Sequence, residues 1–324
     1  MQVKSLFFIG FSSLLLCLDV TQAQTWQSLN GPLESNISKI VVWEDTVYVS
    51  SVELGGFFKK HKDDDYWILI NIPEIEALNT IEVGTDGTYY AGGSGPTTGD
   101  SFFRFFVSDS FGKNGELLYE GLEDCRGPHS VINEIVVTEK ESLIINCGDR
   151  IFKFDNEQES FNQSSGNSGI PTNRVFSFYE YADTLFAGRI NGFEYSTDDG
   201  DSWTSSSFDS LEVFSIAYAD NKLFVGTNEG LYSAGAVNGT FEVVDELFDF
   251  PVYALHTYQD QLIAGTDSGA FIISPGNFDI QSLFQAFDFG SIKAINSIGD
   301  ALLFGTDSGF YECTVTEDTC ELTG

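Results

Sequence analysis

The chain has 324 residues, of which 42% are hydrophobic and 15% aromatic, and its formal net charge is −34. This apolar content is enough for a sizeable core and excludes a wholly disordered chain. The negative charge excludes sites for nucleic-acid phosphates or anionic lipid surfaces, which need positive potential. We therefore expect a folded protein with no nucleic-acid partner and no membrane insertion.

The first residues have the pattern of an export signal. Lys4 gives a basic start, an apolar run extends from Leu6 to Leu18, and small residues precede a cleavage position after Ala23. The run is too short for a transmembrane helix, and an uncleaved signal anchor is the alternative. We expect residues 1–23 to be a signal peptide and the mature chain to be secreted, extracellular, or periplasmic in a bacterium.

Three irregular units of short apolar runs follow in the N-terminal half. A Gly-rich stretch at 92–99 interrupts the second unit, and we expect it to be a surface insertion. The expected strands of the three units cover 37–42, 46–50, 57–58 and 66–70; then 81–83, 88–91 and 102–107; then 132–137, 143–146 and 151–154.

The C-terminal half contains four copies of a clearer pattern. The anchor glycines Gly188, Gly226, Gly265 and Gly305 stand 38, 39 and 40 residues apart. Each lies at the end of a second apolar run and is followed by a polar turn and a third run. Turn signals at short intervals, without a helical period, exclude a helical solenoid. Four short strands in about forty residues are typical of a propeller blade.

Together the units predict an all-β protein, a β-propeller of seven four-stranded blades in a single domain at 24–324. Ring closure is open, because either segment 25–30 or segment 320–323 could complete the last blade. The expected blades are 36–78, 79–128, 129–173, 174–212, 213–250, 251–290 and 291–324.

Four of the five cysteines lie beyond the signal: Cys125, Cys147, Cys313 and Cys320. An even number in an exported protein predicts disulfides. Cys313 and Cys320 flank a short turn and could join adjacent strands, which would leave Cys125 to pair with Cys147. No CxxC is present and the three histidines are scattered, so we predict no zinc or other metal site from them.

One octet matches the pattern S-x-D-x-G-x-x-W in full, with Ser196, Asp198, Gly200 and Trp203. This is the Asp-box, and by it the chain resembles the BNR-repeat propellers, a superfamily with sialidases, sortilin-type receptors, xyloglucanases and photosystem assembly propellers. The resemblance implies that the box is a structural hairpin between the third and fourth strands of a blade. It also implies that the box lies on the face opposite the usual active site.

The catalytic set of sialidases is not recognisable in this sequence. The resemblance would require an arginine triad that begins near the N-terminus, whereas no arginine precedes Arg104 in the mature chain. We therefore predict no catalytic residues. The 49 acidic residues guarantee close carboxylate pairs somewhere, so a glycoside hydrolase of the Asp-box type remains an alternative.

In such blades the turns after the second and fourth strands share one face, which would be the binding face. An acidic rim there could bind Ca²⁺, a basic protein segment or a polyhydroxylated glycan. The simpler alternative is that these residues only make good turns. No cofactor is predicted, with Ca²⁺ left open. The candidate binding residues are Arg189, Asn191, Asn228, Glu229, Asp249, Asp267, Asp288 and Asp307.

The sequence thus predicts a secreted, non-catalytic propeller that acts as a binding or scaffold module for a protein or a glycan. The alternatives are the Asp-box glycoside hydrolase and a structural subunit of an extracellular assembly, and the oligomeric state is left open. Asn36, Asn162 and Asn238 are glycosylation acceptors only in a host that has the pathway.

Overall fold

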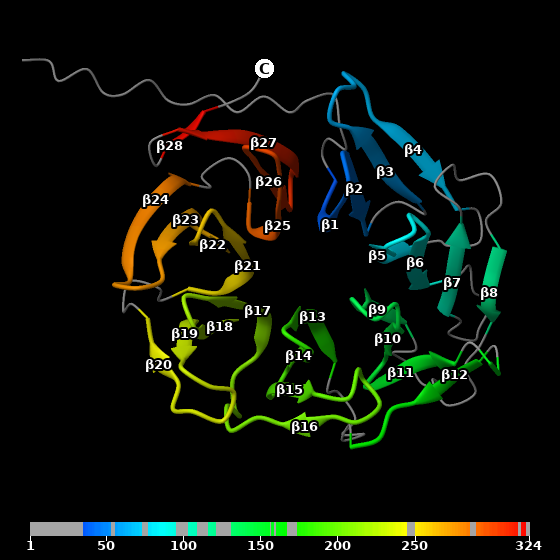
Figure 1. Ribbon diagram of the computed structural model, residues 1–324. Helices are drawn as coiled ribbons and strands as arrows, with labels where there is room; N and C mark the ends of the chain where they lie inside the picture. Colours follow the sequence, from blue (N-terminus) through cyan, green and yellow to red (C-terminus); the bar gives the residue numbers. More distant parts are fainter. Residues whose placement is uncertain are drawn as a thin grey trace, which may run out of the picture.

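The computed structural model describes residues 35–52, 56–72, 77–94, 103–108, 116–120, 131–155, 157–158, 160–166, 174–244, 250–285, 290–316 and 319–321. These residues form 28 β-strands in seven four-stranded antiparallel sheets. Figure 1 shows the sheets arranged as blades around a common axis. Among the described residues, no helix is long and apolar enough to cross a membrane.

Each sheet is one contiguous segment, and its strands follow in chain order from the axis outward (Figure 1). Blades 1 and 2 contain β1 (Ile37–Trp43), β2 (Thr46–Ser51), β3 (Gly56–His61) and β4 (Ile68–Asn71), then β5 (Ala77–Val83), β6 (Tyr89–Ser94), β7 (Phe103–Ser108) and β8 (Glu116–Glu120). Blades 3 and 4 contain β9 (Ile132–Val137), β10 (Leu143–Cys147), β11 (Arg150–Asp155) and β12 (Ser160–Gln163), then β13 (Val175–Tyr181), β14 (Thr184–Arg189), β15 (Gly192–Ser196) and β16 (Thr204–Ser205). Blades 5 and 6 contain β17 (Val213–Ala219), β18 (Lys222–Thr227), β19 (Gly230–Ala234) and β20 (Glu242–Val243), then β21 (Val252–Tyr258), β22 (Gln261–Thr266), β23 (Gly269–Ser274) and β24 (Asp279–Gln285). Blade 7 contains β25 (Ile292–Ile298), β26 (Ala301–Thr306), β27 (Gly309–Thr316) and β28 (Thr319–Glu321).

The innermost strands close into a ring. Each of β1, β5, β9, β13, β17, β21 and β25 contacts the next, and β25 contacts β1. The outer strand of blade 7 is β28, from the C-terminal end of the chain, so the last blade contains four strands of its own. Segment 25–30, the other candidate for that place, lies outside the described residues.

The seven four-stranded sheets differ in the length of their outer strands. The outer strands β16 and β20 contain two residues each, all of them exposed. In blade 4 the reason is local: Trp203 is buried, at 3% exposure, and only Thr204 and Ser205 pair with β15 before the chain leaves the sheet. In blade 5 the outer strand gains little from burial, since Val243 is 50% exposed.

The anchor glycines of the repeat are explained by packing between blades. A Cβ on Gly265 would lie 2.6 Å from Ile292 Cγ2 of the next blade, and one on Gly188 would lie 2.6 Å from the carbonyl oxygen of Val213. Any side chain there would push the next innermost strand away. The hydrophobic core is accordingly divided into clusters between neighbouring blades.

Candidate binding site at the rim of the axis

Each innermost strand contains one β-bulge, and all seven bulges lie near its first residues. A bulge leaves one residue unpaired and can re-aim its side chain. These residues therefore encircle the axis at one end, which we call the rim. The rim residues are Ser38, Asn79, Asn133, Phe176, Phe214, Tyr253 and Lys293.

Half of the rim is a continuous row of aromatic and cationic side chains. The ring centroids of Phe176 and Phe214 are 5.1 Å apart, and those of Phe214 and Tyr253 are 5.2 Å apart. Lys293 Nζ lies 3.2 Å from the Tyr253 centroid, and Arg174 Cζ lies 5.5 Å from that of Phe176. We call these five residues the rim crescent. Such contacts hold the rings in fixed positions relative to one another.

Two predicted residues, Asp267 and Asp307, are brought together beside the crescent. Ser291 donates its hydroxyl to Asp267 and its backbone N–H to Asp307 Oδ2, the latter at 3.2 Å. Tyr253 also donates its hydroxyl to Asp267 Oδ2, at 3.4 Å. Both aspartates are exposed, so their carboxylates remain open to a ligand.

The ionisable groups of the crescent are perturbed by this arrangement. Burial lowers the pKa of Lys293, against the attraction of Asp307 and Asp267. Burial also raises the pKa of Tyr253, and the negative charge of Asp267 adds to that shift. The site therefore combines aromatic rings, an ammonium group and two carboxylates within one short arc.

Other predicted residues serve the turns of the same face. Asn228 Oδ1 accepts the backbone N–H of Glu212 at 3.0 Å, while Asn191 and Glu229 are exposed. Thr227 Oγ1 accepts the N–H of Glu229 at 3.0 Å and donates to the carbonyl of Gly230. The turns that begin at Thr266 and Thr306 repeat this pattern, which accounts for the recurring Gly-Thr-x-x-Gly sequence.

Arg189 does not present its guanidinium group to solvent. It is 1% exposed, its Nη2 lies 2.7 Å from Glu194 Oε2, and its Nη1 donates to the carbonyl of Asp149 at 3.4 Å. Burial lowers its pKa. We therefore leave Arg189 out of the candidate site. Asp249 and Asp288 lie outside the described residues.

Ser196, Asp198, Gly200 and Trp203, the residues of the predicted Asp-box, belong to a tight hairpin at the opposite end of the sheets from the rim. Ser196 Oγ accepts the N–H of Gly200 at 2.9 Å and donates to Asp198 Oδ1 at 2.7 Å. Asp198 also accepts the N–H of Ser202 at 2.9 Å, and Gly200 has a φ of +84°. The side chains of Ser196 and Asp198 are therefore engaged within the turn, whereas Trp203 is buried and packs on Phe178.

Cys147 and Cys313 are both buried, at 1% and 0% exposure. Cys125 lies outside the described residues, and only the backbone of Cys320 is described, opposite Val315 in β28. The two disulfides therefore stay predictions. In the described part of the chain, no three potential metal-ligating side chains gather. Binding of Ca²⁺ at the acidic turns, left open by the sequence, is not tested by this structure.

The crescent was not singled out from the sequence, although its signal is present. Phe176, Phe214, Tyr253 and Lys293 occupy the same place in four successive repeats, directly after a buried Val or Ile. Only the bulges reveal that these side chains are set apart from the strand pairing. The repeat shows that these four residues occupy equivalent positions, whereas only the closed ring shows that their side chains are close together.

No protein-family model and no curated protein matches this chain. Solved structures do resemble it. The GH74 enzyme of Niastella koreensis has a TM-score of 0.70 at 13% identity, over 92% of this chain and 55% of that one. The extracellular domain of a protein described as a hybrid two-component system from B. thetaiotaomicron has a TM-score of 0.67 at 15% identity, over 91% and 40%. YCF48 from Cyanidioschyzon merolae has a TM-score of 0.63 at 13% identity, over 89% and 97%.

The chain spans 39% to 40% of the length of the B. thetaiotaomicron structures. At such low identities these likenesses establish the architecture and carry no activity across. They agree with the closed ring of innermost strands described above. The chain has the fold of a β-propeller.

Proposed function

We propose that this protein is an exported, non-catalytic β-propeller that binds a protein or glycan ligand at the rim crescent. The observation that carries the proposal is the row of three contacting rings, Phe176, Phe214 and Tyr253, between the cations of Arg174 and Lys293. Its residues come from four neighbouring blades, so the closed ring alone assembles it.

The chemistry of the crescent supports recognition of an amphipathic ligand. The rings offer flat apolar faces to a side chain or a sugar, and Asp267 and Asp307 accept hydrogen bonds at its edge. Export rests on the expected signal peptide at 1–23 and agrees with the name of the B. thetaiotaomicron structure, which is the extracellular domain of a hybrid two-component system. We also propose that Ser196, Asp198, Gly200 and Trp203 are an Asp-box with a structural role only.

The test is a binding screen on a glycan array and a peptide array, with the double variant Phe214→Ala/Tyr253→Ala beside the unaltered protein. We expect at least one ligand that the double variant binds about tenfold or more weakly, since each ring contact contributes about 1 kcal/mol. Tyr66→Ala is the control, because Tyr66 is 59% exposed in blade 1 and belongs to no part of the rim.

A parallel assay on aryl-glycosides and polysaccharides separates binding from catalysis. The proposal expects no turnover above that of the double variant. Turnover that depends on Asp267 or Asp307 would instead support the glycoside hydrolase, which needs two carboxylates in the site.

A further inference from the structure

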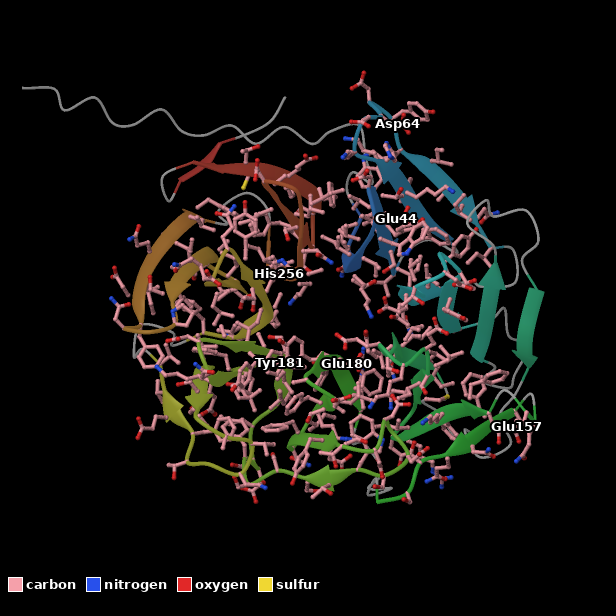
Figure 2. The ribbon with its side chains drawn as sticks, viewed as in Figure 1. Glu44, Asp64, Glu157, Glu180, Tyr181 and His256 are labelled. Carbon is pink, nitrogen blue, oxygen red and sulfur yellow. The ribbon has the colours of Figure 1, made fainter. Side chains whose placement is uncertain are left out.

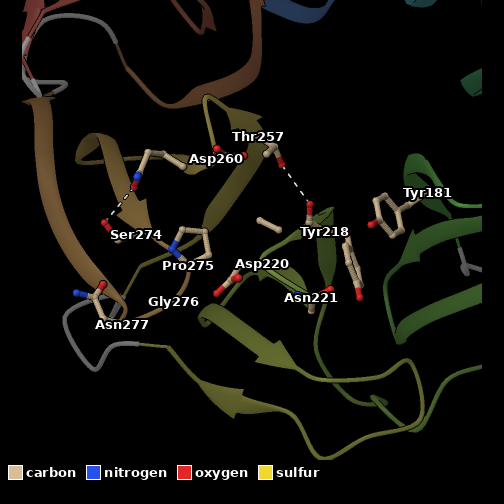
Figure 3. A pocket seen from close by; sticks show the side chains of 12 residues that line it. Tyr181, Tyr218, Asp220, Asn221, Thr257, Asp260, Ser274, Pro275, Gly276 and Asn277 are labelled. Atoms are coloured by element: carbon tan, nitrogen blue, oxygen red, sulfur yellow. Dashed lines mark hydrogen bonds between the residues drawn. The ribbon is translucent and has the colours of Figure 1, made fainter.

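A groove of about 630 Å³ lies between blades 5 and 6, at the opposite end of the sheets from the rim. Figure 3 shows its lining, which comes from the turn between β17 and β18, the turn between β21 and β22, and the turn between β23 and β24. The volume lies within the range of small-molecule sites, which is about 300–1,000 Å³. None of the predicted binding residues belongs to the groove.

One wall of the groove is a stacked tyrosine pair. The rings of Tyr181 and Tyr218 are 4.0 Å apart at an interplanar angle of 20°. In Figure 3 Tyr218 lies between Tyr181 and the other lining residues. Tyr181 is 43% exposed, so the pair stands at the surface and is not part of the hydrophobic core. The stack fixes the orientation of Tyr218, which gives the groove a flat apolar wall.

Polar groups surround this wall. Asp220 and Asn221 come from one turn, Asp260 from the next blade, and Asn277 from the turn after β23. All four are exposed, and no hydrogen bond or ion pair is found for the carboxylates of Asp220 and Asp260 within the described residues. Asn277 Oδ1 accepts the backbone N–H of Asp279 at 3.2 Å, so the two carboxylates and the amide of Asn221 are the groups most available to a ligand.

The nearby cation is already engaged. Lys222 Nζ donates to the carbonyl of Pro275 at 3.1 Å and lies 4.0 Å from the centroid of Phe278. The lining itself contains no basic side chain. An anionic ligand would therefore meet two carboxylates without a free positive charge, which makes the groove unsuited to phosphate or sulfate groups.

We propose that this groove binds a neutral saccharide. The Tyr218 ring packs on the C–H face of a pyranose, and the carboxylates of Asp220 and Asp260 accept its hydroxyls. The side-chain amide of Asn221 supplies a donor and an acceptor, and that of Asn277 supplies its N–H donors, which suits hydroxyl groups better than a cation. A basic peptide would use the two carboxylates and leave the amide donors unmatched, so the saccharide fits the lining better.

The test is titration calorimetry with tetrasaccharides of glucose, xylose, mannose and N-acetylglucosamine, and with a hexa-arginine peptide as the cationic probe. We expect at least one tetrasaccharide to bind. We expect Tyr218→Ala to weaken that binding by about tenfold or more, which corresponds to about 1.4 kcal/mol. Tyr66→Ala is the matched control and should leave it unchanged.

A second variant guards against misfolding of the first. Asp260→Asn keeps the size of the side chain, and Asn tolerates the φ of +63° at this exposed turn. Asp260→Asn should also weaken binding of the saccharide, whereas the double variant Phe214→Ala/Tyr253→Ala at the rim should leave that binding unchanged. The two sets of variants therefore test binding at the rim and binding in the groove independently.

The proposal is overturned if no tetrasaccharide binds at millimolar concentration, or if binding survives both Tyr218→Ala and Asp260→Asn. Binding of hexa-arginine alone, lost in Asp260→Asn, would overturn it in favour of a basic protein segment.

Discussion

Gly305 of the last blade packs directly on Ile37 of the first, and this contact closes the ring. A Cβ on Gly305 would lie 2.5 Å from Ile37 Cγ2 and 3.2 Å from the Cβ of Ala294. Ile37 is fully buried, so it cannot move aside without disturbing the innermost strand β1. The same relationship joins Gly265 to Ile292 one blade earlier.

Gly305→Ala should therefore destabilise the protein by about 1–3 kcal/mol, the usual effect of adding a methyl group to a packed core. Urea unfolding followed by circular dichroism measures it. Gly235→Ala is the control, because nothing lies within 4 Å of a Cβ at Gly235, and it should change stability by less than about 0.5 kcal/mol. Equal effects of the two substitutions would contradict closure through this contact.

The hairpin between β15 and β16 of blade 4 is anchored to blade 3 through Asp199. Lys153 Nζ donates to Asp199 Oδ2 at 3.0 Å, and Thr138 Oγ1 donates to Oδ1 at 2.9 Å. Partial burial would raise the pKa of Asp199, but the hydrogen bonds from Ser142, Lys153 and Thr138 hold it below its ordinary value. Asp199 is thus a link between blades, not a turn residue alone.

Asp199→Asn should lower the free energy of unfolding at pH 7 by about 1–2 kcal/mol, as expected for hydrogen bonds to a charged group. Asp201→Asn is the matched control. Its carboxylate also meets Lys153, at 3.2 Å, but it is 69% exposed, so its loss should cost less than about 0.5 kcal/mol. The pKa of Asp199 is depressed in the folded state. The stability difference between the unaltered protein and Asp199→Asn should therefore shrink as the pH falls below about 4 and vanish once Asp199 is protonated in the folded protein.

Lys39 of β1 bridges the innermost strands of the first three blades. Its Nζ lies 3.2 Å from Glu82 Oε2, contacts Glu134 Oε1, and donates to the carbonyl of Ile135 at 3.1 Å. Although burial alone would lower the pKa of Lys39, the two carboxylates raise it, so it stays protonated. Burial raises the pKa of Glu134 against the pull of Lys39.

Lys39→Met should destabilise the protein by about 3 kcal/mol, because two partly buried carboxylates lose their shared counter-ion. Thermal unfolding at pH 7 measures the loss. Adding Glu134→Gln to Lys39→Met should recover part of it, since one of the unpaired charges is then gone. A double variant no more stable than the single one would mean that Lys39 acts through packing alone.

The repeat could be predicted from the sequence, but the rim crescent and the groove could not. Gly188, Gly226, Gly265 and Gly305 could be recognised because close packing between blades permits no side chain at those places. The acidic turn residues were predicted as binding residues from their place on one face. Because tight turns themselves favour Asp, Asn and Gly, the sequence could not distinguish a turn residue from a binding residue.

The rim crescent and the groove depend on proximity that no local pattern encodes. Phe214 and Tyr253 are 39 residues apart in the sequence, and Phe176 and Phe214 are 38 apart. Their rings meet only because neighbouring blades pack side by side. Arg189 is the opposite case. Its place at the turn after a second strand predicted a binding residue on the exposed face, and its buried partner Glu194 could not be recognised from the sequence.

His256 in β21 should remain neutral well below the usual range of histidine (Figure 2). Burial lowers its pKa from 6.5 to about 4, and its Nε2 lies 2.9 Å from Ser297 Oγ of blade 7. Between these two pH values the unfolded chain binds a proton that the folded protein does not. The stabilisation that neutral His256 contributes is therefore fully present above pH 6.5 and is lost as the pH falls towards 4.

The NMR titration of the His256 ring should show a midpoint near pH 4, and His256→Gln should flatten the pH dependence of unfolding between pH 6.5 and 4. The contribution amounts to at most about 3 kcal/mol, from the linkage between pKa and stability. A midpoint near 6.5 would show that the ring is open to water in solution.

We predict that the mature chain contains the disulfides Cys313–Cys320 and Cys125–Cys147. Cys147 in β10 of blade 3 and Cys313 in β27 of blade 7 belong to blades that are not neighbours, so these two cannot pair. Cys320 lies opposite Val315, two residues along β27 from Cys313, which puts both cysteines on one face of the same hairpin.

Peptide mapping without reductant should yield the two linked pairs, and dithiothreitol should lower the free energy of unfolding by about 2–5 kcal/mol. Cys320→Ser is the sharper variant, because it should leave the Cys125–Cys147 pair intact and free one thiol, that of Cys313. Since Cys313 is fully buried, this thiol should react with a thiol reagent only after unfolding. Rapid labelling of the folded variant, or a peptide that links Cys320 to Cys147, would contradict the pairing.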